Sequence, residues 1–271
     1  MANKIILIRG NVALKKYIYE LIKRKDLLVY LVVSGIKAEY RNTILGYVWW
    51  ILDPLLMGAV YFFLRVVVLG MEGDHIGAFL IIGLVAWKWI TSSVNKSAKS
   101  ITGKSGVITQ VYLPKALFPF GVTLSQGVNF TFGLAVVAMF LAFYRLMPGI
   151  EILWLPVIMA IQFMFLSAIS LVLGYYATFI RDIDNVLTHI MRFWFYGSPV
   201  IWETGRIPPE YSYIVDANPA SAFLMGYRNV LMYHAQPDWQ RLFLIGVISF
   251  VVIVYMIYFY HLNEHKLIKA L

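Results

Sequence analysis

The stretch 40–56, YRNTILGYVWWILDPLL, passes within seventeen residues from a basic, hydrated flank into an apolar run that contains an Asp-Pro pair. The 21 residues from 44 to 64 carry one charge, that of Asp53. At about 1.5 Å of rise per residue they cover roughly 30 Å, the thickness of the hydrocarbon layer of a bilayer. We therefore predict that this segment is the first membrane-spanning helix.

Composition extends this prediction to the rest of the chain. Of its 271 residues, 61% are hydrophobic and 14% are charged, whereas soluble globular proteins have about 25% charged residues. An integral membrane protein with several spans is expected. The absence of cysteine excludes disulfides, thiolate catalysis and cysteine metal sites. The amino terminus lacks the apolar core and cleavage site of a signal peptide, so no cleaved leader is expected.

The apolar runs predict an all-α fold, a single domain over residues 1–271 with six spans. A shorter apolar segment, 219–233, is expected either to re-enter the membrane or to lie on its outer surface, because 15 residues cannot cross. The six spans are expected at about 44–64, 76–94, 116–144, 152–179, 185–202 and 242–262.

An amphipathic segment precedes the first span. Residues 11–25 place apolar side chains at helical spacing on one face and basic side chains on the other. The run 27–36 that follows has ten residues, too few to cross a bilayer. Residues 11–36 are therefore predicted to form a helix that lies in the membrane interface.

The basic residues predict the orientation of the chain. If both termini lie inside, the inner segments hold 16 lysines and arginines and the outer segments hold four. This asymmetry follows the positive-inside rule. The net charge of +9 is then expected to face anionic lipid or cytosolic partners, and not nucleic acid.

Sequence motifs for catalysis are incomplete. Gly103-Lys104-Ser105 is similar to the end of a phosphate-binding loop, but the required earlier glycine is replaced by Ala98. His234 and Asp238 are one residue closer than an acyltransferase motif requires, and the five histidines do not cluster for a metal. No catalytic or metal site is predicted, and energy must come from another chain or from an ion gradient.

Charges inside the predicted spans mark either a polar pathway or a buried ion pair without a transport role. Asp53 lies mid-span beside Pro54, which frees the carbonyl of Trp50 and predicts a kink. Arg192 in the fifth span is a candidate partner for Asp53. Lys88 is expected to extend to the inner membrane face.

Two aromatic clusters are candidates for a sugar-lined path, with ordinary packing as the alternative. Together with Asp53 and Arg192 they complete the candidate substrate path, and they consist of Trp49, Trp50, Phe193, Trp194, Phe195 and Tyr196.

Three stretches of the chain carry a resemblance to a known family. They are 40–56, then FIRDIDNVLTHIMRFWFYGSPVIW at 179–202, and NPASAFLMGYRNVL at 218–231. In this order they resemble the ABC-2 type permeases of polysaccharide and teichoic acid exporters. Asp53 departs from the uncharged residue that many relatives have before the proline.

This resemblance implies a complex of two copies of the chain with two copies of a separate P-loop ATPase, which binds ATP and Mg. The cargo would be a polymer on a polyprenyl diphosphate lipid, moved from the inner to the outer leaflet of the bacterial cytoplasmic membrane. Wall teichoic acid is slightly favoured over O-antigen or capsule. An ABC-2 permease for a drug or small lipid, and a membrane-bound transferase, are the alternatives.

Within that frame, Lys37, Tyr40 and Arg41 are candidates for receiving the lipid diphosphate at the inner interface. Two inner loops are candidates for contact with the ATPase, the alternative being solvated connections that only set the topology. These coupling candidates are Lys96, Lys99, Lys104, Gln110, Arg181, Asp182 and Asp184.

Overall fold

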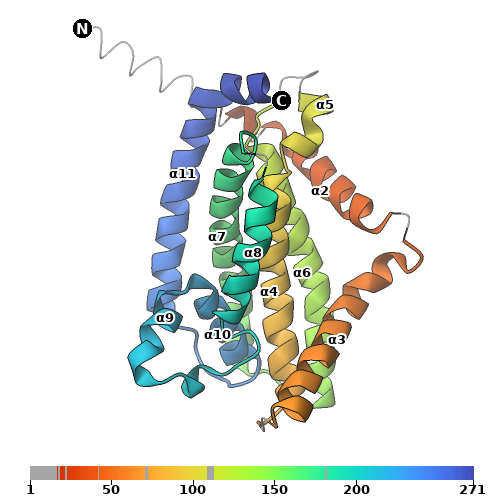
Figure 1. Ribbon diagram of the computed structural model, residues 1–271, viewed down its shortest axis with the longest axis vertical. Helices are drawn as coiled ribbons and strands as arrows, with labels where there is room; N and C mark the ends of the chain where they lie inside the picture. The colour runs from red at the N-terminus through yellow and green to blue at the C-terminus, as the bar shows by residue number, and fades with distance from the viewer. Residues whose placement is uncertain are drawn as a thin grey trace.

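The computed structural model describes residues 17, 19–21, 23–41, 43–70, 73–108, 113–180 and 182–271, and within them it contains helices and no strand (Figure 1). The helices surround α4 and leave one long face of α3 uncovered. Their bounds are α2 Lys25–Tyr40, α3 Trp49–Phe62, α4 Ile76–Ala98, α5 Ser105–Ile108, α6 Leu117–Phe143, α7 Leu155–Tyr176, α8 Ile183–Tyr196, α9 Ser212–Ala217, α10 Pro219–Leu231 and α11 Trp239–Ala270.

Among the described residues, five helical segments are long and apolar enough to cross a membrane. The predicted span 185–202 is not among them, so the six-span topology is not confirmed. Its helix, α8, ends at Tyr196 and the chain turns through 197–200, which leaves a helix of about 21 Å. The five segments are Gly46–Val68, Ile76–Ala98, Leu117–Phe143, Ile150–Tyr176 and Trp239–Ala270.

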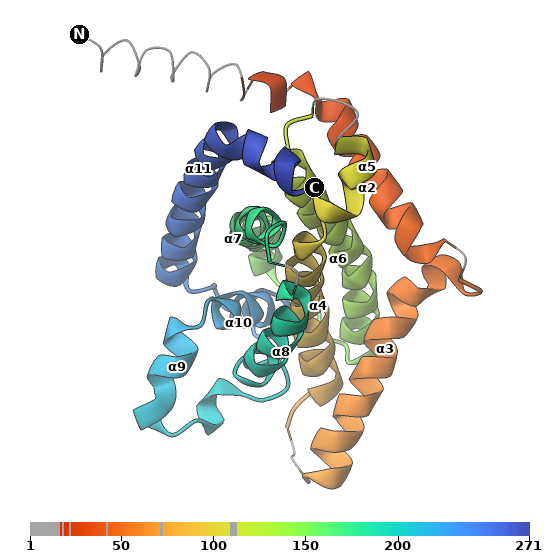
Figure 2. The same ribbon diagram turned by 45° about the horizontal axis from the view of Figure 1, so that its top comes forward.

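The helix α4 lies at the centre of the bundle. It packs against α6, α7 and α3, and also against α10 and α8. In both views α4 lies between α8 and α3, while α11 lies on the far side of α7 (Figures 1 and 2). We refer below to the two ends of the bundle as the α5 end and the α9 end.

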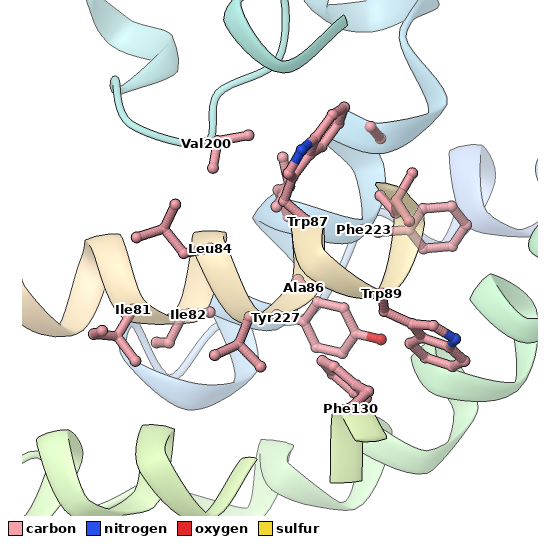
Figure 3. Packing of buried hydrophobic residues seen from close by; sticks show 14 of the residues in the cluster. Ile81, Ile82, Leu84, Ala86, Trp87, Trp89, Phe130, Val200, Phe223 and Tyr227 are labelled. Atoms are coloured by element: carbon pink, nitrogen blue, oxygen red, sulfur yellow. The ribbon is translucent and has the colours of Figure 1, made fainter. Parts of the chain in front are cut away.

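The core around α4 is aromatic. The rings of Trp89 and Phe130 stack with centroids 4.8 Å apart, and Tyr227 packs on Phe130 from α10 (Figure 3). The Tyr227 hydroxyl donates to Oε1 of Gln162 over 2.7 Å. The one polar atom that this ring brings into the core is therefore satisfied.

The helix α10 lies inside the bundle, in contact with α4, α7 and α11. Its start is capped by Asn218, whose side chain accepts from the Ala220 amide over 3.0 Å, and Pro219 occupies the first turn. Because most of its side chains are buried, the structure favours the re-entrant alternative for 219–233 over a surface position.

The amphipathic segment is described only in part, since residues 11–16, 18 and 22 lie outside the described residues. In the described part the helix continues to Tyr40, beyond the predicted end at 36. This helix, α2, packs along α6. Its position relative to the membrane stays a prediction.

Candidate functional site

A cleft of ≈ 600 Å³ opens between α3, α4 and α8. One wall comes from α3 and the other from α8, and α4 forms the floor. Apolar atoms make up most of its lining surface, and charged and hydrogen-bonding side chains are set among them. They are Asp53, Tyr61, Lys88, Thr91, Ser92, Asn95, Thr188, Arg192 and Tyr196.

The cleft exists because α3 touches α4 along a narrow strip and then diverges from it (Figure 2). Gly58 makes this approach close, since a Cβ atom there would lie 2.6 Å from Cδ1 of Ile81. The helix continues through Pro54, and beyond Phe62 it widens into a π-helix over Phe63–Val68. A π-helical segment is a frequent mark of functional sites in long helices.

Asp53 is paired with Lys88 and not with Arg192. The Lys88 ammonium donates to Oδ2 of Asp53 over 2.8 Å, and the two side chains are 36% and 44% exposed. The candidate partner Arg192 therefore does not pair with Asp53, and the expected extension of Lys88 to the inner membrane face stays a prediction. The carboxylate across the cleft holds the lysine at the level of Asp53.

The predicted path residues of α8 divide between two faces. Arg192, Phe195 and Tyr196 line the cleft, and the Phe195 ring contacts Tyr61 and Trp87 at centroid distances of 5.3 and 5.6 Å. Phe193 is 80% exposed and does not line the cleft.

Trp194 packs inside the bundle. Its ring meets Trp87 edge to face at 5.6 Å, and its indole N–H donates to Oδ1 of Asn218 over 2.8 Å. These contacts join the end of α8 to the start of α10. They place Trp194 among packing residues, away from the cleft.

Trp49 and Trp50 lie at the elbow between α2 and α3. The Trp50 ring stacks on Phe132 at 3.8 Å and contacts Tyr40 and Tyr47 at 5.3 and 4.8 Å. Trp49 is half-buried beside it. The elbow is thus an aromatic cluster of its own, separate from the cleft.

The candidates for lipid entry lie next to this cluster. Lys37 and Arg41 are exposed, while Tyr40 is buried against Trp50. Two cations therefore remain accessible at the end of α2, and the phenol between them has a packing role.

Glu39 is a residue that the sequence did not single out. Its Oε2 accepts from Lys96 over 2.6 Å, from Gln126 over 3.3 Å and from Asn129 over 3.2 Å. Burial alone would raise the pKa of Glu39, but these donors outweigh burial and hold the pKa below its ordinary value of 4.5. Glu39 fastens the elbow to the last turn of α4 and to α6.

The two predicted coupling loops meet at the α5 end. Lys99 follows α4 and pairs with Asp184 at the start of α8, with Nζ and Oδ2 2.9 Å apart. A groove of ≈ 420 Å³ runs between these loops. Lys104 and Asp182 are exposed there. Gln110 and Arg181 lie outside the described residues.

Two arginines, Arg228 and Arg65, join segments at the α9 end. The Arg228 guanidinium, buried on α10, donates to the carbonyls of Phe79 over 3.2 Å and Val200 over 2.7 Å, and lies 3.4 Å from the Phe79 ring centroid. Arg65 donates to the Ile201 carbonyl over 3.2 Å and pairs with Glu203. Such a buried arginine needs several acceptors, which a sequence does not display.

Metal chemistry finds no support in the described residues, among which no three His, Cys, Asp or Glu side chains gather closely enough to hold an ion.

Comparison with known proteins gives a consistent result. A sequence profile for the ABC-2 type transporter matches residues 26–232, from α2 to the end of α10. Two proteins of Klebsiella pneumoniae, each named O-antigen export system permease protein RfbA, are 28% identical over 208 residues, covering 76% of this chain and 80% of theirs. A protein of the same name from Myxococcus xanthus is 27% identical over 240 residues, covering 88% and 92%.

Proposed function

The chain belongs to the ABC-2 type transporter family, and from that premise we propose that it is the membrane subunit of an ATP-driven exporter of a cell-surface polysaccharide. The family and the apolar helices make it a multi-pass membrane protein. The relatives named as O-antigen export permeases support a glycan as the cargo.

The observation that carries this proposal is the cleft, whose lining includes charged and hydroxyl-bearing side chains. Exposure of charged groups to lipid costs several kcal/mol. A water-filled passage avoids that cost and suits a glycan, whose hydroxyls exchange hydrogen bonds with water and with the lining. Phe195 and Tyr196 add aromatic faces for sugar C–H surfaces.

A second copy of the chain is proposed to cover the cleft. Apolar side chains of α3 outside the cleft are exposed, with Leu56 51% and Val60 60% accessible. Phe193 and Ile190 on α8 are 80% and 49% exposed. Two copies that pair through α3 and α8 bury these side chains and enclose the polar lining between them.

The α5 end is proposed to face the cytosol and the ATPase. The basic residues favour that orientation, and the Lys99–Asp184 pair joins the two coupling loops around one groove. ATP and Mg would be bound by the ATPase subunit, since this chain has an incomplete phosphate-loop motif. Movement of the groove would reach α8 directly, because Asp184 belongs to its first turn.

The cargo is proposed to be a polymer on a polyprenyl diphosphate lipid, which enters from the inner leaflet near Lys37 and Arg41. The names of the relatives favour an O-antigen type of glycan, and wall teichoic acid stays a prediction. A drug or small-lipid permease and a membrane-bound transferase are the rival functions.

Depletion of the protein tests the proposal. The expected result is that a lipid-linked glycan accumulates on the inner leaflet, and that a P-loop ATPase copurifies with the chain. Normal surface glycan after depletion, together with an accumulating drug or a missing acyl or glycosyl modification, would replace the proposal by one of its rivals.

A further inference from the structure

The cleft carries more positive than negative charge. Its ionisable lining groups are the carboxylate of Asp53, the ammonium of Lys88, the guanidinium of Arg192 and the phenols of Tyr61 and Tyr196. Phenols are neutral near pH 7. Among the described residues the lining therefore has one cation in excess, and two copies of the chain would double that excess.

Lys88 and Arg192 lie at similar heights. Lys88 precedes the last residue of α4, Ala98, by ten positions, which is about 15 Å. Arg192 follows the first residue of α8, Ile183, by nine positions, which is about 14 Å from the same end of the bundle. An anion in the cleft would meet both cations at one level.

Arg192 differs from the two arginines at the α9 end. Arg65 pairs with Glu203, and Arg228 donates to backbone carbonyls. For Arg192, in contrast, the described residues supply neither a carboxylate nor a hydrogen-bond acceptor. A guanidinium offers five donors in a planar fork that matches phosphate or carboxylate oxygens.

Neutral hydrogen-bonding side chains line the same cleft. Thr91, Ser92 and Asn95 come from α4, and their hydroxyl and amide groups can donate to an anion without adding charge. Thr188 lies one turn before Arg192 on α8, and its hydroxyl donates to the Asp184 carbonyl over 2.9 Å.

We propose that Lys88 and Arg192 form a transient binding site for phosphate groups within the cleft. The inference rests on the proposed function, and it specifies the cargo as one whose phosphate passes the middle of the bundle. The phosphate has two sources, namely the diphosphate that links lipid to glycan and phosphodiesters within the glycan itself.

Asp53 keeps the binding of phosphate at this site reversible. It holds Lys88 at 2.8 Å, so an arriving phosphate exchanges with a carboxylate already in place. A path for translocation must bind its cargo weakly enough to release it.

The test uses the cysteine-free background of the chain. Thr188→Cys places one thiol in the cleft of the full chain in lipid nanodiscs, and Thr131→Cys places one on an exposed face of α6. We expect inorganic diphosphate to slow labelling by a thiol reagent at position 188 and not at 131. Arg192→Gln should weaken this protection about tenfold, the loss of one charge-assisted contact, and Arg192→Lys should restore part of it.

Two further probes identify the source. Protection by a short isoprenyl diphosphate alone assigns the lipid linkage, and protection by a soluble sugar phosphodiester alone assigns the glycan. The proposed phosphate site is rejected if labelling is equal with and without every phosphate probe, or if Arg192→Gln is protected as well as wild type. Arg192 would then be assigned to contact with a second copy of the chain. Export by the wild-type complex is measured separately, because export without protection removes this inference and leaves the proposed function intact.

Discussion

Arg228 shows how one side chain can hold three segments. Its guanidinium reaches the carbonyls of Phe79 on α4 and of Pro199 and Val200 in the turn after α8. The carbonyls of Pro199 and Val200 lie in the turn beyond the end of α8, so partners for them must come from outside the regular hydrogen-bond pattern. Arg228 supplies them from within α10.

Replacement of Arg228 by methionine should destabilise the protein strongly. Each carbonyl left unpaired costs about 1–3 kcal/mol, so the midpoint of thermal unfolding in detergent should fall well below that of wild type. Arg228→Lys should fall between the two, because an ammonium cannot reproduce the planar fork. Arg145→Met, at an exposed position, serves as the control. Equal unfolding midpoints for Arg228→Met and wild type would show that the hydrogen bonds of the Arg228 guanidinium do not stabilise the fold.

Glu39 predicts a pH dependence at the other end of the bundle. Its pKa is lowered in the folded state, so the ionised carboxylate stabilises the fold above its ordinary value of 4.5. That contribution is lost as the pH falls through the lowered pKa.

Thermal unfolding of wild type and Glu39→Gln measures this effect. The wild type should unfold at a higher temperature near about pH 7, and the difference should shrink toward about pH 4. Glu210→Gln, at an exposed position, should show no such difference. A difference in unfolding temperature that stays constant over this pH range would mean that the charge of Glu39 does not contribute to stability.

At the scale of elements, the contact between α4 and the turn after α8 depends on Gly83. A Cβ atom there would lie 2.6 Å from the Val200 carbonyl oxygen and would also press on the Arg228 guanidinium. Gly83→Ala should therefore cost about 1–3 kcal/mol through overpacking.

Gly246→Ala on α11 is the matched control, because its added Cβ atom would meet Ile161 at an ordinary 3.7 Å. The comparison is made by thermal unfolding of the two variants. If Gly83→Ala unfolds at the same temperature as Gly246→Ala, α4 and the turn are not as tightly joined as described.

Five of the six expected spans overlap long apolar helices of the described residues, because a long apolar run is its own signal. The run predicted at 76–94 became Ile76–Ala98, and that at 116–144 became Leu117–Phe143. In the segment 185–202 the helix ends early, because Pro199 and Val200 are apolar yet form a turn. Hydropathy detects how apolar a segment is and not where its helix ends.

Some residues of the site could be predicted from the sequence, but their positions relative to one another could not. Asp53 and Arg192 were identified because charges in apolar runs are rare. Their separation, and the choice of Lys88 as the partner of Asp53, depend on which helices are neighbours. Glu39 and Arg228 were missed for the same reason, since their partners come from distant parts of the chain.

At the scale of the whole molecule, the exposed side chain of Phe193 predicts pairing between copies. Phe193→Ala should raise the dimer dissociation constant about tenfold if the substitution removes about 1.4 kcal/mol of packing from the dimer. Phe243→Ala, on α11 with 72% exposure, should leave it unchanged. The fraction of dimers in nanodiscs measures both. Equal dimer fractions for the two variants would place the interface elsewhere.

The central claim is that glycan passes through the cleft between α3, α4 and α8. Export of a lipid-linked glycan by vesicles containing the chain and its ATPase tests it most directly. A bulky thiol reagent is attached to Thr91→Cys inside the cleft, or to Val251→Cys on α11, which is 59% exposed. Modification at position 91 should abolish export while ATP hydrolysis continues, and modification at 251 should leave export intact. Undiminished export after complete modification at position 91 would contradict the claim.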